Sequence, residues 1–344
     1  MKAMGFNRHG GPEVMEPVEV PDPVPGDNEV LIRLSATSVN RLDILAREGV
    51  HGMQMRMPHI PGTDIVGTVE KAGRDAKKFS EGELVISNTV YGCGMCANCK
   101  SGNDNLCAKW KCYGLQVNGS YGELISVPER LLSRPNSMYS IEELAAMPHS
   151  LSVAWRAIHT LAMAKAGETI LVRGASGNTG IFSILLSKAM GLNVIAMSRS
   201  KEKSEKLKKL GANHVLDSNG SADSLKEEVM SMTNGNGADI ILETFGSTLG
   251  ESVGLATPSA RIISFGTLLG AMSEVSIRRL YLWNVSILGM HNAGKAELDA
   301  AFEFASSHNI RPVIAKKMPI ERAAEAQSSL EQAEYFGKIV LEHW

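Results

Sequence analysis

Four of the five cysteines in this 344-residue chain fall within one short segment. Cys93, Cys96, Cys99 and Cys107 follow a C-x2-C-x2-C-x7-C spacing. Thiolates so spaced converge on one tetrahedral Zn²⁺, with Zn–S bonds of about 2.3 Å. Because protein fills all four positions, no room is left for substrate or activated water. The segment predicts one structural zinc ion in a lobe near residues 91–112, with an iron–sulfur cluster or free thiols as alternatives.

A second motif is the sequence ETILVRGASGNTG, in which Gly174, Gly177 and Gly180 lie between a strand pattern and a helix pattern. Glycines at this place permit a tight turn and let backbone N–H groups approach a pyrophosphate at the helix N-terminus. The spacing is GxxGxxG, so the strand before it and the helix after it carry the prediction of a dinucleotide site. The alternative is a turn that merely tolerates glycine.

The end of the next strand predicts which dinucleotide binds. A carboxylate there would contact the ribose 2′-hydroxyl of NAD. This chain instead has Ser198, Arg199 and Ser200, followed by Lys201 and Lys203. A hydroxyl and a guanidinium suit a 2′-phosphate, so the sequence predicts that NADP(H) is preferred over NAD(H). The alternative is that these charges are the solvated start of a helix.

The chain that must position these motifs has two regions with different predicted secondary structure. Residues 29–40, 64–73 and 83–87 carry β-branched runs separated by Gly and Pro, which indicates a β-rich domain. From about residue 140, strands alternate with helices, which predicts a doubly wound parallel sheet. The predicted domains are residues 1–150, residues 151–290, and a C-terminal segment of residues 291–344 that returns to the first domain.

Composition excludes several classes of partner. The formal net charge is -2, with 44% hydrophobic and 21% charged residues. These values are typical of a globular protein and do not favour nucleic acid or a membrane surface as a partner. The sequence also lacks a recognisable signal peptide or membrane span, so we expect a cytoplasmic protein.

The chain resembles the medium-chain dehydrogenase/reductase superfamily, which includes zinc-type alcohol dehydrogenases and quinone oxidoreductases. The resemblance rests on IPGTDIVGTVEKAG (residues 60–73), the four-cysteine segment, NGSYGELISVP (residues 118–128), the glycine-rich turn and the closing GKIVLEHW. It implies a GroES-like β-rich catalytic domain, a Rossmann-type domain, a homodimer or homotetramer, and a small-molecule substrate. The predicted cofactor-binding residues are Gly174, Ser176, Gly177, Asn178, Thr179, Gly180, Ser198, Arg199, Lys203, Phe245, Gly266 and Lys338.

The chain departs from the family at the positions of the catalytic zinc. Members that use this zinc carry a Cys where this chain has Asn40, and Gly-His-Glu where it has Gly62, Thr63 and Asp64. Leu42 stands where they carry a proton-relaying hydroxyl, and the remaining ligand position falls near His149. Asn and Thr are poor zinc ligands, so we expect no catalytic zinc. The alternative is a weak metal held by Asp64 and His149.

The predicted catalytic residues are Asn40, Thr63 and Asp64, with Asn40 as the first candidate hydrogen-bond donor and Asp64 orienting the donors. Without a Lewis acid, reduction of an enone, quinone or acryloyl-type thioester is easier than reduction of a simple ketone. The sequence therefore predicts an NADPH-dependent reductase of an activated double bond or quinone. An alcohol dehydrogenase with an atypical site and a non-catalytic NADPH-binding protein are the alternatives.

An apolar substrate pocket is expected from residues 51–57, Tyr91, Trp110 and residues 281–283, although the same side chains suit ordinary packing.

Overall fold

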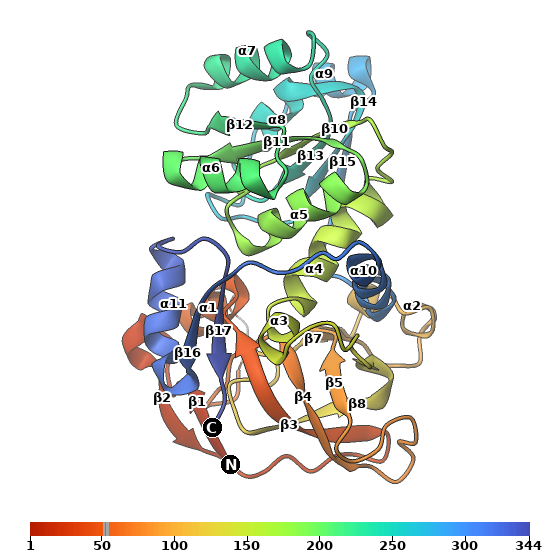
Figure 1. Ribbon diagram of the computed structural model, residues 1–344, viewed down its shortest axis with the longest axis vertical. Coiled ribbons are helices and arrows are strands. Elements are labelled where there is room, and N and C mark those ends of the chain that lie inside the picture. The colour runs from red at the N-terminus through yellow and green to blue at the C-terminus, as the bar shows by residue number, and fades with distance from the viewer. Residues whose placement is uncertain (51, 53–54) are drawn as a thin grey trace. The chain divides into compact units, whose positions relative to one another are not determined.

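A computed structural model of the chain describes residues 1–50, 52 and 55–344, so part of the predicted pocket segment 51–57 lies outside the described residues. The chain forms two compact units (Figure 1). The first comprises residues 1–152 and 293–344, and the second comprises residues 153–292. The chain enters the second unit within α4 (Pro148–Trp155), which continues as a π-helical segment, Arg156–Leu161.

The first unit is built on a seven-stranded sheet in the order β16-β17-β3-β4-β5-β9, with β8 also paired to β3. Alternating apolar side chains of β3, among them Val30, Ile32 and Leu34, pack into its core. The strands are β3 (Glu29–Ser38), β4 (Ile65–Ala72), β5 (Leu84–Ser87), β8 (Leu124–Pro128), β9 (Leu132–Ser133), β16 (Ile314–Pro319) and β17 (Lys338–Glu342). Two further two-stranded antiparallel sheets pair β1 (Lys2–Gly5) with β2 (Glu16–Glu19) and β6 (Val90–Tyr91) with β7 (Lys111–Cys112).

The C-terminal strand positions a residue of the candidate site. β17 runs antiparallel to β3, with Val340 opposite Ser38. Continuing this register by two residues brings Lys338, the first residue of β17, level with Asn40. The helices of this unit are α1 (Arg41–Glu48), α2 (Ala97–Lys100), α3 (Ile141–Ala145), α10 (Lys295–Ser307) and α11 (Ala323–Glu331).

The second unit contains a six-stranded parallel sheet in the order β12-β11-β10-β13-β14-β15. This confirms the predicted Rossmann-type sheet, and the β-rich first unit confirms the GroES-like prediction. Its strands are β10 (Thr169–Val172), β11 (Asn193–Ser198), β12 (His214–Asp217), β13 (Ala238–Glu243), β14 (Ala256–Ser264) and β15 (Ser286–Gly289). Helices α5 (Asn178–Ala189), α6 (Lys201–Leu210), α7 (Ala222–Met232), α8 (Leu249–Leu255) and α9 (Ile277–Trp283) cover it (Figure 1).

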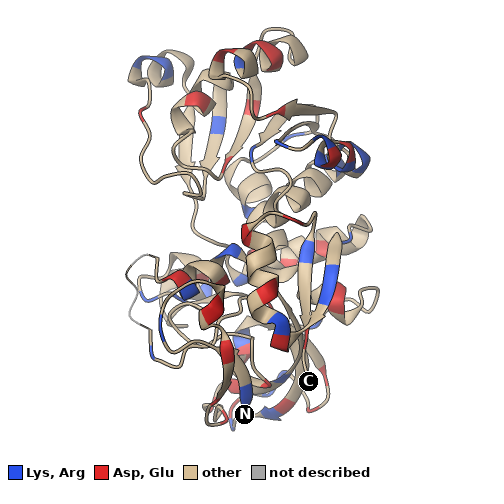
Figure 2. Ribbon diagram, turned by 90° about the vertical axis from the view of Figure 1, so that its left-hand side faces the viewer, with Lys and Arg blue, Asp and Glu red and all other residues tan. Residues whose placement is uncertain are grey.

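Acidic and basic side chains are interspersed along the ribbons of both units (Figure 2). This pattern agrees with the small formal net charge and does not favour a polyanionic partner. Among the described residues, none of the helices combines the length and the apolar character that crossing a bilayer requires.

Candidate functional site

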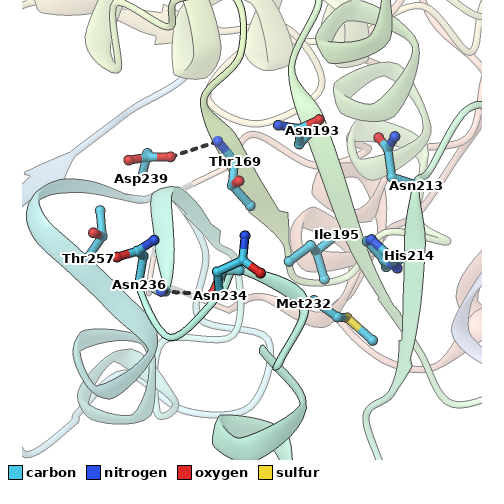
Figure 3. A pocket seen from close by; sticks show the side chains of 12 residues that line it. Thr169, Asn193, Ile195, Asn213, His214, Met232, Asn234, Asn236, Asp239 and Thr257 are labelled. Atoms are coloured by element: carbon cyan, nitrogen blue, oxygen red, sulfur yellow. Dashed lines mark hydrogen bonds between the residues drawn. The ribbon is translucent and has the colours of Figure 1, made fainter. Parts of the chain in front are cut away.

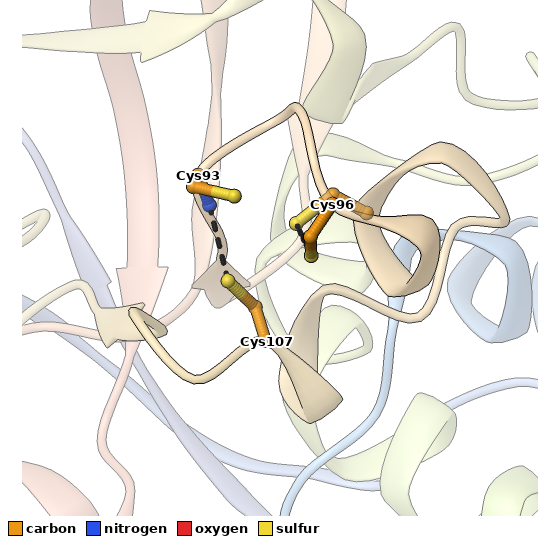
Figure 4. Close-up of side chains that lie close together, drawn as sticks. Cys93, Cys96 and Cys107 are labelled. Atoms are coloured by element: carbon orange, nitrogen blue, oxygen red, sulfur yellow. Dashed lines mark hydrogen bonds between the residues drawn. The ribbon is translucent and has the colours of Figure 1, made fainter.

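The four-cysteine segment, which we call the zinc lobe, brings its sulfurs together. The Sγ atoms of Cys93, Cys96, Cys99 and Cys107 all lie within 4.8 Å of one another. Tetrahedral zinc with Zn–S bonds of about 2.3 Å needs sulfurs about 3.8 Å apart. Figure 4 shows Cys93, Cys96 and Cys107 directed toward a common centre. The residues therefore fit a closed zinc site, in which the ion would hold the lobe together.

Backbone hydrogen bonds favour thiolates at Cys93 and Cys107, whereas burial raises the pKa of Cys99 to about 12. The N–H groups of Cys93 and Lys109 each donate to Cys107 Sγ at 3.3 Å. Hydrogen bonds from the backbone of Met95 and Cys96 lower the pKa of Cys93 to about 6. Because a thiolate is the form that binds a metal, these donors prepare the site for a cation.

Sequence reasoning missed the residues that support the lobe. A Cβ placed on Gly92 would lie 2.4 Å from Cys99 Sγ, so a side chain there would collide with the sulfurs. The Gly92 N–H donates to the buried Asp104 Oδ1 at 3.1 Å, and Arg130 donates both to that oxygen and to the Gly92 carbonyl. Arg130 follows the cysteines by more than twenty residues, and no spacing rule connects it to them.

Five buried side chains form a second group, which we call the Asp64 cluster: Ser38, Asn40, Thr63, Asp64 and Lys338. They come from the end of β3, the cap of α1, the residues just before β4 and the start of β17. The structure thus brings together all three predicted catalytic residues and Lys338, which was predicted to contact the cofactor. Sequence reasoning missed Ser38, because a serine at a strand end gives no signal of its own.

Asp64 is the acceptor at the centre of this cluster. Its Oδ2 accepts from Ser38 Oγ at 2.5 Å, from Asn40 Nδ2 at 2.7 Å and from Lys338 Nζ at 3.1 Å. Its Oδ1 accepts from the backbone N–H of His149 at 2.8 Å. Burial alone would raise the pKa of Asp64, but the charges of Lys338 and His149 and these hydrogen bonds lower it. The carboxylate is therefore ionised at neutral pH.

Asn40 joins the cluster to the start of α1. As the N-cap of that helix, it donates its backbone N–H to Asp43 Oδ2 at 2.8 Å. Tyr121 donates its hydroxyl to the same oxygen at 3.3 Å. Burial raises the pKa of Asp43 to about 7, although the bond from Asn40 opposes the shift. Asp43 therefore orients Asn40 through its backbone, while Leu42 packs against the apolar core.

Metal-binding groups are restricted to the lobe in the part of the chain that the structure describes. The four cysteines are the one set there of three or more His, Cys, Asp or Glu residues able to converge on an ion. At the Asp64 cluster, the carboxylate faces hydroxyl, amide and ammonium groups. That donor set suits an internal ion pair better than Zn²⁺.

The glycine-rich turn of the second unit has the geometry of a dinucleotide site. Gly174 lies in the turn after β10 and has φ +67°, which favours glycine. A Cβ on Gly180 would lie 2.4 Å from the Gly174 carbonyl oxygen. Gly177 is the N-cap of α5 and provides no side chain to cap it, and the positive end of the helix dipole there favours an anion. Ser176, Asn178 and Thr179 lie in the same turn, and these residues fit a pyrophosphate.

Basic side chains follow β11, where the ribose end of a dinucleotide is predicted. Ser198 Oγ donates to the Ser200 carbonyl at 3.2 Å, and Ser200 caps α6. Arg199 is exposed and Lys203 is partly buried. Burial lowers the pKa of Lys203, and the nearby positive charges of Lys206 and Arg199 act in the same direction. A bound anion would reduce the electrostatic repulsion between these side-chain cations.

The other predicted cofactor residues of this unit lie beyond the carboxyl ends of β13 and β14. A Cβ on Gly174 would lie 3.6 Å from the Phe245 ring, so that ring borders the turn. A Cβ on Gly266 would lie 2.3 Å from the Thr244 carbonyl oxygen. The buried Glu243 accepts from Arg173, from Thr248 at the N-cap of α8 and from Ser252 within that helix. Sequence reasoning missed this support.

A polar pocket lies elsewhere in the second unit (Figure 3). Its volume is about 450 Å³, and Thr169, Asn193 and His214 line it from the first residues of their strands. It therefore lies at the amino ends of the strands, opposite the glycine-rich turn, and shares no residue with the predicted cofactor site.

Of the side chains predicted to line the substrate pocket, Tyr91 packs on Tyr113 with ring centroids 5.0 Å apart, and Tyr281 is exposed on α9.

Comparisons with known proteins agree with this architecture. Residues 26–136 match the alcohol dehydrogenase GroES-like domain, and residues 179–307 match the zinc-binding dehydrogenase family. The chain is 27% identical to an acryloyl-coenzyme A reductase of Metallosphaera sedula, covering 99% of both chains. It is 28% identical to an NAD-dependent alcohol dehydrogenase of Sulfolobus acidocaldarius, again covering 99% of both. A crystal structure of an NAD-dependent alcohol dehydrogenase superposes with a TM-score of 0.92 at 31% identity, covering 99% of each chain.

These matches cover both units and confirm the resemblance drawn from the motifs. The chain belongs to the medium-chain dehydrogenase/reductase superfamily and is an NAD(P)-dependent oxidoreductase.

Proposed function

We propose that the protein is an NADPH-dependent reductase of an activated carbon–carbon double bond or a quinone, acting without a catalytic metal. The observation that carries the proposal is the Asp64 cluster. Asn40 and Thr63, which replace the Cys and His of zinc-dependent members, are tied to one another and to Asp64 by hydrogen bonds. A relative named acryloyl-coenzyme A reductase supports the same substrate class.

The cluster suits a reaction in which negative charge develops on a conjugated oxygen. The nicotinamide, when bound, supplies the hydride, which adds to the β-carbon of the substrate. The pair of electrons of the double bond moves toward the carbonyl oxygen as an enolate, and the α-carbon then takes a proton from solvent. Both amide hydrogens of Asn40 are directed to Thr63 and Asp64. The Thr63 hydroxyl therefore becomes the first candidate donor to the enolate oxygen.

Steady-state NADPH oxidation with a panel of enones, quinones, acyl-thioesters, aldehydes and ketones tests the proposal. Turnover confined to the conjugated substrates is expected. Turnover of simple aldehydes or ketones that depends on added zinc would favour the alcohol dehydrogenase alternative, which the relative from S. acidocaldarius supports. Absence of turnover across the panel, with NADPH still bound, would favour a non-catalytic binding protein.

The preference for NADP(H) rests on Arg199 and Lys203 beside the end of β11. Removing Arg199 should weaken NADPH binding about tenfold or more and leave NADH binding nearly unchanged, because only NADPH carries the 2′-phosphate. The measurement is the dissociation constant of each cofactor for Arg199→Ala. Arg278→Ala, which removes another exposed arginine of the second unit, is the matched control. An unchanged dissociation constant for NADPH would exclude this assignment.

The oligomeric state is proposed to be a homodimer or homotetramer. β15 is the edge strand of the parallel sheet, and exposed apolar side chains precede it in the chain: Leu268, Leu269, Met272, Ile277, Tyr281 and Leu282. An open strand edge with an apolar border favours self-association. Light scattering of the purified protein tests this, and a monomer at all concentrations would exclude it.

The cytoplasm remains the expected compartment, in which the cysteine thiols stay reduced.

A further inference from the structure

The ammonium group of Lys338 occupies the middle of the Asp64 cluster. Lys338 is 1% exposed, and Nζ donates to Asn40 Oδ1 at 2.7 Å, to Ser38 Oγ at 2.9 Å and to Asp64 Oδ2 at 3.1 Å. An ammonium has three N–H donors and no acceptor, so these three partners use its full capacity. The position of Nζ is therefore fixed from three sides.

This cation and the Asp64 carboxylate together determine how the Asn40 carboxamide is turned. Only an oxygen can face a group that donates and never accepts, so Oδ1 must point to Lys338. The NH₂ end then points the other way, where it donates to Thr63 Oγ1 at 2.8 Å and to Asp64 Oδ2 at 2.7 Å. Without the ammonium and with Asp64 neutral, the flipped amide would present its oxygen to Thr63 and accept that hydroxyl's hydrogen.

The orientation of the amide in turn determines what Thr63 can do. Because Thr63 Oγ1 accepts from Asn40, its own hydrogen is not directed at Asn40. None of the described side chains or carbonyls accepts this hydrogen. Thr63 is fully buried, so an oxygen brought against it would meet the donor in a surrounding of low dielectric constant, where a hydrogen bond is strong.

We propose that Lys338 is a positioning residue of the reaction centre, whose ammonium holds the Asn40 amide in the orientation that leaves the Thr63 hydroxyl hydrogen for the substrate oxygen. The role of Thr63 rests on the proposed function, but the effect of Lys338 on the amide does not. Asp64 balances the buried charge, and Ser38 connects the two by accepting from Lys338 and donating to Asp64.

The test removes the ammonium without leaving a buried charge unpaired. Lys338→Met alone leaves the Asp64 carboxylate unpaired and can unfold the protein. The informative comparison is therefore Lys338→Met/Asp64→Asn against Asp64→Asn, because these two variants differ only in the ammonium group. The matched control is Arg33→Met combined with Glu70→Gln, which removes an exposed ion pair between β3 and β4 of the same sheet. The control should leave every readout unchanged.

The first readout is the Asn40 side-chain amide in a nitrogen-15 NMR spectrum, assigned by its loss in Asn40→Ala. Hydrogen exchange of this amide should quicken by about tenfold or more in the Lys338→Met/Asp64→Asn variant relative to Asp64→Asn, because the amide is free to turn. Exchange as slow as in Asp64→Asn would overturn the proposal. This readout needs no substrate, so it stands even if the proposed reductase activity fails.

The second readout is kinetic. Loss of one oriented donor should lower kcat for a conjugated substrate about 100-fold, with little change in the KM of NADPH. A kcat equal to that of Asp64→Asn in the folded double variant would overturn the proposal. A weakened NADPH dissociation constant with unchanged kcat would also overturn it and would return Lys338 to its predicted role as a cofactor contact.

Discussion

The zinc lobe and the Asp64 cluster each surround one cation site, but the two sites differ in the source of the cation. The lobe offers four sulfurs from a single short segment, and its Cys93 and Cys96 are partly exposed. The cluster is buried, its ligands are oxygens, and the cation is the side chain of Lys338. Soft thiolates select a metal ion from solution, whereas a carboxylate among hydroxyl and amide groups is satisfied by an internal ammonium. The difference teaches that a buried carboxylate can be balanced by a side-chain ammonium in place of a metal ion.

The largest effect is expected from breaking the lobe. Cys99→Ser replaces a buried thiolate by a hydroxyl, which is a poor zinc ligand, so zinc should be lost and the segment 91–112 should unfold locally. Zinc content and thermal melting measure the result. Cys112→Ala is the control, since Cys112 is buried outside the set of four and should keep a full equivalent of zinc. Equal zinc in both variants would contradict a closed four-cysteine site.

A smaller effect is expected from breaking the cluster. Lys338→Met leaves Asp64 buried and unpaired, which should lower the free energy of unfolding by about 3–5 kcal/mol. Arg33→Met removes a cation from the exposed pair with Glu70 on the same sheet and should cost at most about 1 kcal/mol. Urea unfolding of both variants measures the contrast. Similar losses for the two would show that Lys338 is not the main partner of Asp64.

The smallest effect concerns Asp43, which holds the backbone of Asn40. Its pKa is about 7 in the folded chain because of burial, against 3.8 when exposed. The folded state therefore keeps a proton that the unfolded state loses, so stability falls as pH rises from about 4 to 7. Asp43→Asn should flatten this slope and be more stable than the wild type at pH 8, by on the order of 2 kcal/mol. Parallel slopes for the two proteins in urea unfolding would contradict the raised pKa.

The sequence predicts a group of residues well when its members are close together in the chain, and the two groups differ in this respect. The four cysteines lie within fifteen positions, and their ligand chemistry is specific, so spacing alone indicates them. The glycine-rich turn is local too, and its strand and helix were visible as periodic patterns. Lys338 and Asp64 are 274 residues apart, and their contact depends on the pairing of β17 with β3. Ser38, Arg130 and Glu243 were missed for the same reason, because their partners are set by tertiary packing.

The predicted catalytic residues lie together in the structure, but the order of residues does not show which of them has a hydrogen to donate. Asn40 was the first candidate donor, yet both of its amide hydrogens are used within the cluster. The positions of Lys338 and Asp64 reveal which end of the amide faces which neighbour, and hydrogen-bond direction has no signature in residue order.

The central claim is that the single metal of the chain lies in the zinc lobe and that the Asp64 cluster carries its own cation. Anomalous diffraction at the zinc edge, from crystals grown with NADPH and excess zinc, tests this most directly. The account predicts one peak per chain, bonded to Cys93, Cys96, Cys99 and Cys107. A second peak beside Asp64 and His149, with the Lys338 ammonium displaced, would contradict it.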